Sequence, residues 1–366
     1  MSGRAQVLAQ VRRQVVDICL RGLDTGTFRI RVLQAIRRAV PVDAVWFATA
    51  DPHTLLFTGG ISDPDILPAA PMFMRNELMG NDVNKFFQLA QAHPPVSSLF
   101  AATDGRMESS PRYRDILEPL HLGDELRVAL VGGRLCWGYM CLHREGRSPP
   151  FNAQEAAFMA SLSPVLADGL RASLNLDDRG VPEPEGGPGL IILGPDLEFT
   201  AANQPARAWL DQAAEEEWHR GYELPPVVLA VAGQLMSRRP AGGARAAVPT
   251  ARMRTRTGGW LGVRASRLSG PGMQDAIAVV LEPPPTSEVL PLLAQTHALT
   301  GREAEVVRLV IRGLSTAQLS IQLHISESTV QDHMKSIFDK VGVRSRRELV
   351  AQLTARSYRG HSEGGD

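Results

Sequence analysis

The strongest constraint on the fold is a row of helix-start and helix-stop signals in residues 299–343, near the end of the chain. Thr300, with Glu303 three residues later, has the spacing of a capping box and predicts the start of a helix. Gly313 stands where a left-handed residue would end that helix, and Ser326 is placed to cap another one. Signals spaced this closely predict a compact group of short helices.

The apolar residues between these signals recur at the helical period. In a helix predicted over residues 326–342, Val330 and Ile337 belong to a stripe that faces the core. A short helix capped by Ser315 comes before it and is joined to it by a very tight turn, and a further helix is expected over residues 346–354. Two helices joined in this way, the second with a polar N-terminal half, predict a helix-turn-helix motif.

This pattern resembles the LuxR-type helix-turn-helix, the DNA-binding domain of many bacterial transcription regulators. The resemblance is carried by residues 299–307, 313–315, 325–330, His333 and 340–343. It implies an all-α four-helix domain over residues 290–358, in which recognition helix 326–342 enters the major groove and the fourth helix contacts a second subunit. The candidate DNA-binding residues are Thr316, Ser328, Thr329, Gln331, Asp332, Lys335, Arg344, Arg346 and Arg347.

Some of these candidates depart from what the family often carries. Gln331 stands where a lysine often follows the Thr-Val pair, and the next residue is Asp332. A carboxylate near phosphates is unfavourable unless it accepts from a cytosine amino group, whereas glutamine pairs with adenine. Residues 316–320 also lack the lysine and glutamate that are usual in the second helix. We therefore expect an unusual base preference and one phosphate contact fewer.

The C-terminal segment is only weakly basic, whereas nucleic-acid binders are often strongly basic. Residues 290–366 contain 10 Lys and Arg against 8 Asp and Glu, a balance of +2, and the whole chain balances at zero. Because a monomer would bind weakly, we expect a homodimer on two half-sites, with Arg344, Arg346 and Arg347 as phosphate contacts. The alternative interpretation is a protein-interaction module whose helical bundle has lost its affinity for DNA.

Two stretches with little to bury divide the rest of the chain. Residues 177–188 are rich in proline, glycine and acidic residues, and residues 282–286 include three consecutive prolines, which form either a semi-rigid spacer or an inert tether. A chain of 366 residues, 44% of them hydrophobic, has room for two or three cores. The predicted fold is multidomain α+β, with α/β sensory domains over residues 1–176 and 187–283 ahead of the helical domain.

The first sensory domain resembles the GAF type by the order of its elements. After two helical patterns comes a strand candidate over residues 43–49. Residues 127–131 and 135–142 are strand-like and are joined through two glycines, which predicts an antiparallel hairpin. A helix over residues 153–174 closes the domain.

The middle domain begins as PAS domains do. A strand over residues 189–193 is followed by a tight turn, a second strand and Asn203, which opens a short helix. Further strand-like runs lie at residues 251–255, 260–267 and 276–281. The order resembles a PAS domain, although Asn203 is its only motif residue.

No cofactor and no metal are predicted. Residues 187–282 contain no cysteine, which excludes a flavin-adduct thiol, and their single histidine, His219, is expected to face solvent rather than to bind haem. Cys19, Cys136 and Cys141 are expected to be buried free thiols. Since Cys136 and Cys141 lie five apart on one strand, we expect them to point to opposite faces.

The expected partner is double-stranded DNA, with RNA polymerase and a small-molecule effector left open. Trp46, Phe47, Trp137 and Tyr139 are candidate lining for an apolar or aromatic effector, although core packing is the simpler role for them. No nucleophile and base stand in a catalytic arrangement, so an enzyme is not expected. Without a signal peptide or a hydrophobic run of about 18 residues, the sequence predicts a cytoplasmic one-component transcription regulator with no membrane contact.

Overall fold

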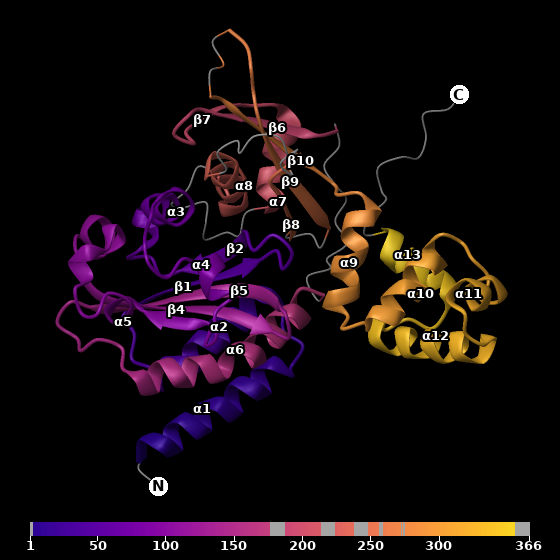
Figure 1. The fold of residues 1–366 in the computed structure, drawn as a ribbon, viewed down its shortest axis with the longest axis horizontal. Helices are drawn as coiled ribbons and strands as arrows, with labels where there is room; N and C mark the ends of the chain where they lie inside the picture. Colours follow the sequence, from indigo (N-terminus) through magenta and orange to yellow (C-terminus); the bar gives the residue numbers. More distant parts are fainter. Residues whose placement is uncertain are drawn as a thin grey trace. The chain divides into compact units, whose positions relative to one another are not determined.

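The computed structural model describes residues 3–175, 187–213, 224–237, 248–255, 259–271, 273 and 275–355. The chain forms two compact units. The first contains two β-sheets with their helices, and the second contains the C-terminal helices, coloured orange to yellow in Figure 1. His219 lies outside the described residues. Among the helices that are described, none is both long enough and apolar enough to cross a membrane.

The first sheet has five antiparallel strands in the order β2-β1-β5-β4-β3. The strands are β1 (Ala44–Ala50), β2 (Phe57–Ser62), β3 (Val96–Ser98), β4 (Leu122–Gly132) and β5 (Leu135–Glu145). The helices around them are α1 (Gly3–Cys19), α2 (Thr25–Ile36), α3 (Ala70–Met79), α4 (Phe86–Leu89), α5 (Leu99–Ala102) and α6 (Ala153–Ser173), with short helical turns at Leu67–Ala69, Met107–Ser109 and Tyr113–Leu117. The predicted hairpin is confirmed, because β4 and β5 pair up to Gly132 and Leu135 on either side of Gly133, whose φ is +62°.

Different helices cover the two faces of this sheet. α1, α2 and α6 lie on one face, where they enclose a core with Phe47, Leu126 and Met140 of the strands (Figure 1). α6 begins where the sequence predicts, since Asn152 and Glu155 form a capping box. The opposite face carries α3 and α4.

The second sheet has the strand order β7-β6-β10-β9-β8, which repeats the order of the first sheet when the strands of each are counted from its start. Its elements are β6 (Gly189–Leu193), β7 (Phe199–Ala202), α7 (Gln204–Ala213), α8 (Pro226–Ser237), β8 (Thr250–Arg254), β9 (Trp260–Arg267) and β10 (Ile277–Glu282). The side chain of Asn203 accepts from the backbone N–H groups of Leu190 at 2.9 Å and Ala206 at 3.0 Å. The predicted cap therefore also links β6 to the start of α7.

One apolar core, here called the shared core, contains residues of both sheets of the first unit. Tyr139 of the first sheet belongs to it, as do Val227 of α8 and Leu261 of β9. Next to the end of β1, the buried carboxylate of Asp51 accepts from the backbone N–H and the Nε of Arg252, both at 2.9 Å. Because a buried carboxylate is stable only with such partners, this pair ties the β1–β2 connection to β8.

The second unit is helical. It contains α9 (Thr286–Thr296), α10 (Gly301–Ile311), α11 (Thr316–Leu323), α12 (Glu327–Val341) and α13 (Arg346–Ala355). The predicted helices are α10 to α13, with the capping box of Thr300 and Glu303 in place and Gly313 at a φ of +87°. α9 comes before these four helices and was not expected from the sequence: Pro285 forms its N-cap instead of continuing a spacer, and Val289 is buried in the core of the unit.

Cys136 and Cys141 also correct a prediction, since both side chains belong to the shared core. The pairing of β4 with β5 shifts register between Leu130 and Val131. Such a bulge sets two residues of one strand against one of its partner and so resets the alternation of faces. The cysteines are free thiols, as expected, although Cys19 is only partly buried.

Candidate functional sites

α12 has one buried face and one exposed polar face. The Oγ of Ser326 accepts from the N–H of Thr329 at 3.1 Å and starts the helix, and Gly342 ends it with a φ of +78°. Val330 and Ile337 are fully buried. These contacts confirm the helix predicted over residues 326–342. The exposed residues of α12 include Ser328, Gln331, Asp332, Lys335 and Asp339.

Side chains from α10 and α11 fix the turn that leads into α12. His324 adopts the left-handed conformation, with a φ of +53°. The Oγ of Ser320 donates to the carbonyl oxygen of Ile325 at 2.6 Å, and the guanidinium of Arg302 donates to the carbonyl oxygen of Leu323. The carbonyls at a helix end lack partners within the helix. These bonds therefore satisfy the end of α11 and hold the angle at which α12 begins.

Glu303 fastens α12 to α10 and is only 4% exposed. Its carboxylate accepts from Lys340 Nζ, Ser336 Oγ and the backbone N–H of Thr300, each at 2.6 Å. Burial alone would raise the pKa of Glu303, but these hydrogen bonds outweigh burial and lower the pKa to about 2. The positive charge of Lys340 is therefore used inside the unit, a role that is not apparent from the sequence.

The candidate DNA-binding residues lie on two surfaces. Those on α12 are Ser328, Gln331, Asp332 and Lys335, which are exposed, and Thr329, which is half-buried. Thr316, Arg346 and Arg347 line a groove between α10, α11 and α13. The guanidinium of Arg346 donates to the carbonyl oxygen of Leu314 and so satisfies the chain just beyond α10, whereas Arg344 and Arg347 are exposed. The structure thus groups the α12 residues together and places the basic residues around the start of α13.

The first sheet buries a charged network that is likewise not apparent from the sequence. Glu125 on β4 is fully buried and pairs through Oε2 with Arg112 Nε at 2.7 Å and with Arg127 Nε at 3.0 Å. Arg127 Nη1 also pairs with Glu77 at 2.6 Å. Burial would raise the pKa of Glu125, but the two guanidiniums lower it to about 2. On β5, burial lowers the pKa of His143 to about 4, which keeps its imidazole neutral at pH 7.

The four aromatic residues predicted as candidate effector lining lie in three different places in the structure. Trp46 lines a pocket on the face of the sheet that carries α3. Phe47 and Trp137 pack on the opposite face, in the core with α1, α2 and α6. Tyr139 is buried in the shared core, where its hydroxyl donates to the carbonyl oxygen of Leu55 at 2.9 Å. Core packing is thus the role of three of the four.

Comparison with known proteins identifies the C-terminal domain. Residues 297–353 match the family described as "Bacterial regulatory proteins, luxR family" (GerE). The "HTH-type transcriptional regulator MalT" of Yersinia pestis (strain Pestoides F) and that of Serratia proteamaculans (strain 568) are each 34% identical to this chain over 67 residues. The match covers 18% of this chain and 7% of each relative, so the chain spans a small part of their length.

A LuxR-family helix-turn-helix domain therefore occupies residues 297–353, as the sequence predicts, and its relatives are transcription regulators. Both findings support a DNA-binding transcription regulator. The crystal structure of the E. coli DhaR(N)-DhaL complex is similar to 78% of this chain over 91% of its own, with 12% identity and a TM-score of 0.24, which is too low to carry an argument. The GAF-like and PAS-like assignments stay predictions.

Proposed function

We propose that this protein is a transcription regulator that binds DNA as a homodimer and places α12 of each copy in the major groove of one half-site. The exposed polar face of α12 carries the proposal. Gln331 and Asp332 have the side chains that pair with adenine and with the cytosine amino group, and Lys335 can contact guanine or a phosphate. Since Glu303 and Arg302 hold the helix from behind, these side chains are presented on a fixed support.

The distribution of charge supports a dimer. Among the candidate basic residues, Arg346 is used to satisfy the end of α10, which leaves Lys335, Arg344 and Arg347 exposed. Phosphate contacts supply most of the sequence-independent affinity for DNA. One copy with about three such contacts would bind weakly, and a second copy on a neighbouring half-site doubles their number.

For the first unit we propose a sensory role, with a GAF-like domain at the N-terminus and a PAS-like domain after it. The support is that both sheets follow one strand order, that helices cover them, and that Asn203 opens α7 as predicted. In this proposal the protein is a cytoplasmic one-component regulator without catalytic activity, and the state of the first unit sets the affinity of the LuxR-family domain for its operator.

The experiment begins with recovery of genomic fragments bound by the purified full-length protein at two salt concentrations. Fluorescence anisotropy with the recovered operator then compares the wild type with Lys335→Ala and with the control Arg308→Ala, which removes an exposed positive charge from α10. We expect Lys335→Ala to weaken binding on the order of tenfold and to make the log–log salt slope shallower by about 0.9 for each phosphate that is no longer neutralised. Arg308→Ala should change affinity little.

An inverted-repeat motif that is no longer enriched with Lys335→Ala would support the proposal. Diffuse recovery, with equal affinities for the wild type and both variants, would contradict it. That result would favour the protein-interaction module. Two observations are consistent with that alternative: Asp332 is exposed, and the net charge over residues 290–366 is only +2.

A further inference from the structure

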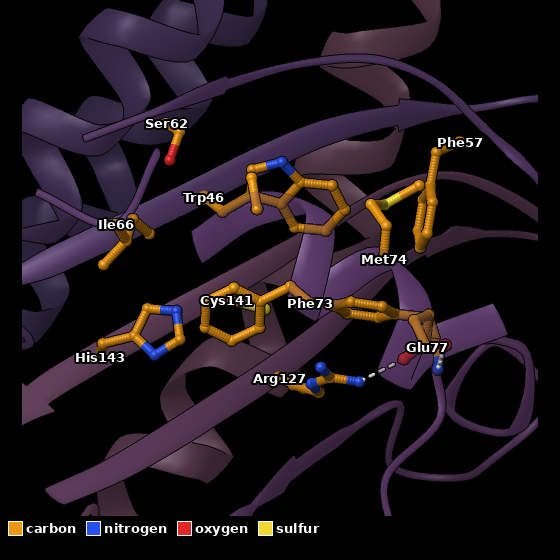
Figure 2. A pocket seen from close by; sticks show the side chains of 12 residues that line it. Trp46, Phe57, Ser62, Ile66, Phe73, Met74, Glu77, Arg127, Cys141 and His143 are labelled. Carbon is orange, nitrogen blue, oxygen red and sulfur yellow. Dashed lines mark hydrogen bonds and ion pairs between the residues drawn. The ribbon is translucent and has the colours of Figure 1, made fainter. Parts of the chain in front are cut away.

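A pocket lies between α3 and the face of the first sheet formed by β1, β4 and β5 (Figure 2). The aromatic rings of Trp46, Phe57 and Phe73 line it, and the centroids of the Trp46 and Phe57 rings are 5.1 Å apart. His143 and Arg127 also line the pocket, and Arg127 lies beside Glu77 (Figure 2). The pocket is therefore mainly apolar, with a few polar side chains in its wall.

His143 has a hydrogen-bonding capacity that the protein leaves unused. Its side chain is 1% exposed, and its ring lies 5.8 Å from the ring of Phe73 between centroids. Within the described part of the chain, Nδ1 has no hydrogen-bond partner. A buried polar atom without a partner is unfavourable. Because a neutral imidazole has one donor and one acceptor nitrogen, either a hydroxyl or a carbonyl group would satisfy it.

The charges beside the pocket are already balanced. Arg127 is paired with Glu77 and Glu125, and Arg112 supplies a second cation to Glu125. His143 adds no charge at pH 7, since burial lowers its pKa to about 4. A carboxylate or an ammonium in the pocket would therefore be a buried charge without a free counter-ion, which is strongly unfavourable. An uncharged molecule avoids this cost.

We propose that this pocket binds a small uncharged organic molecule whose hydroxyl or carbonyl group pairs with His143 and whose hydrocarbon part lies against Trp46, Phe57 and Phe73. The cavity measures about 40 Å³, which is room for about three water molecules at 10–15 Å³ each. A short-chain alcohol or ketone of about four non-hydrogen atoms fits this space. A benzene-sized ring fills a cavity of about 150 Å³, so it would have to displace α3.

The same part of the sheet contains a cluster that resembles a metal site, because ligand atoms of Glu125, Cys141 and His143 lie within 4.8 Å of one another. The guanidiniums of Arg112 and Arg127 already pair with Glu125, and a divalent cation would add positive charge at this buried point. Burial and the neighbouring Glu125 raise the pKa of Cys141, which disfavours the thiolate that binds metals. An uncharged organic ligand suits the pocket better than a metal ion.

The regulatory meaning of this pocket rests on the proposed function. α3 contributes Phe73 and Met74 to the pocket. Beyond them, Leu78 packs closely on Gly233 of α8. A Cβ atom added to Gly233 would lie 2.7 Å from the Cδ1 atom of Leu78. Since no space remains at this contact, a ligand that displaces α3 would also press on α8. The pocket of the first sheet is in this way coupled to the second.

Three molecules of nearly equal shape and different charge test the proposal: acetone, acetate and isopropylammonium. Each is titrated against the full-length protein without DNA, by saturation-transfer NMR on the ligand methyl groups. Because ligands this small bind weakly, the titrations extend to about 50 mM. We expect binding of acetone and no detectable binding of the two ions. A series of larger ketones should lose affinity at ring size.

Two variants show whether binding occurs at this site. His143→Phe keeps a ring but removes both nitrogens and should weaken acetone binding about three- to tenfold. Ala70→Val leaves the polar groups untouched and fills the cavity from α3, so it should abolish binding; it also serves if His143→Phe does not fold. Acetate binding as tightly as acetone, acetone binding equally to both variants, or stoichiometric zinc in the purified protein would each overturn the proposal.

The largest ketone that still binds, and that therefore has to displace α3, is then added to the operator titration. A change in DNA affinity that is absent in Ala70→Val would extend the proposal to regulation. Binding to the pocket without any change in DNA affinity would overturn the coupling through α3 while leaving the uncharged-ligand site in place. Failure of the protein to bind any operator would instead count against the proposed function alone, since the ligand titrations contain no DNA.

Discussion

Glu303→Gln tests how firmly α12 is held against α10. The variant keeps the shape of the side chain and its ability to accept hydrogen bonds, but it removes the charge that pairs with Lys340. The pKa of Glu303 lies at about 2 in the folded protein, against an ordinary value of 4.5. At about 1.36 kcal/mol per pKa unit, this difference of about 2.5 units corresponds to a ceiling of about 3.4 kcal/mol at pH 7. Because Lys340 is one-third exposed and therefore partly screened, we expect a loss of about 2 kcal/mol.

Native-state hydrogen exchange of the full-length protein measures this loss locally. Amides of α10 and α12 that exchange through opening of the second unit should lose about 30-fold in protection at pH 7, the equivalent of about 2 kcal/mol. Amides of the first unit should be unchanged. This readout is preferable to a single melting temperature, because two compact units need not unfold in one transition.

The matched control is Glu305→Gln, on the same helix. Glu305 is 38% exposed and pairs with Arg302 at 2.7 Å, and a surface pair of this kind contributes at most about 1 kcal/mol. Equal losses for Glu303→Gln and Glu305→Gln would refute the reasoning.

The pH dependence gives a second check on Glu303. A carboxyl group whose pKa is lowered by folding stabilises the fold above its unfolded pKa and loses that effect as the pH falls through its folded pKa. The difference between the wild type and Glu303→Gln should therefore shrink between pH 4.5 and pH 2, to less than about half at pH 3. A difference that stays constant over this range would show that the charge of Glu303 does not contribute.

Three further predictions concern the first unit. Asp51→Asn leaves Arg252 without its buried counter-ion and should destabilise the unit by about 3 kcal/mol, measured as a lower urea midpoint; an unchanged midpoint would contradict the role of this pair. The imidazole of His143 should stay neutral in an NMR titration until the pH approaches 4. Since folding lowers the pKa of His143 below the ordinary 6.5, the first unit should lose stability as the pH falls from about 6.5 to about 4. A titration midpoint near 6.5 would rule out a buried ring. Burial raises the pKa of Cys136 to about 11 and also raises that of Cys141. Both thiols of the folded protein should therefore react with a maleimide at pH 7 far more slowly than those of the protein unfolded in urea. Rapid labelling of the folded protein would contradict their burial.

The C-terminal domain could be predicted from the sequence because its determinants are local. The capping box of Thr300 and Glu303 and the left-handed Gly313 act within one or two helical turns. Prolines are an equally local signal, but the three prolines before α9 were interpreted only as a spacer or tether and not as the start of a helix. Pro285 ends the proline run and at the same time caps a helix, and sequence alone does not distinguish a proline that interrupts a helix from one that starts it.

The contacts that the sequence did not predict join residues that lie far apart in the chain. Lys340 meets Glu303 across 37 positions, and Arg346 meets the carbonyl of Leu314 across 32. Arg346 was predicted to contact phosphate and no partner was predicted for Lys340, because charge counting does not show which cations have partners. The two positively charged side chains are instead used to assemble the domain.

The buried ionic network of the first sheet was missed for a similar reason. Glu125 and Arg127 alternate along β4 and so form a polar face, whereas the strand predicted from the sequence began only at residue 127. A polar face is usually a solvent face, whereas here α3 and Arg112 cover it. One sequence clue is that His143, on the neighbouring strand, follows the apolar run of β5.

The small number of candidate cations left for phosphate contacts has a consequence for regulation in the proposed dimer. Three phosphate contacts per copy give a log–log salt slope of about −2.7, so a monomer loses about 40-fold in affinity between 50 and 200 mM salt. Two copies bound together have about twice that slope and lose on the order of a thousandfold. A single copy would therefore hold DNA poorly at physiological salt, and the operator is occupied only when both copies fit their half-sites at once. A signal that changes the distance between the two copies of α12 removes all the phosphate contacts of one copy, whereas truncating one side chain removes a single contact. Every 1.4 kcal/mol of binding free energy is a factor of ten in affinity, so losing all the contacts of one copy releases the operator. A domain with few cations that contact phosphate is therefore more sensitive to dimer geometry than a strongly basic domain, which would stay bound through one copy.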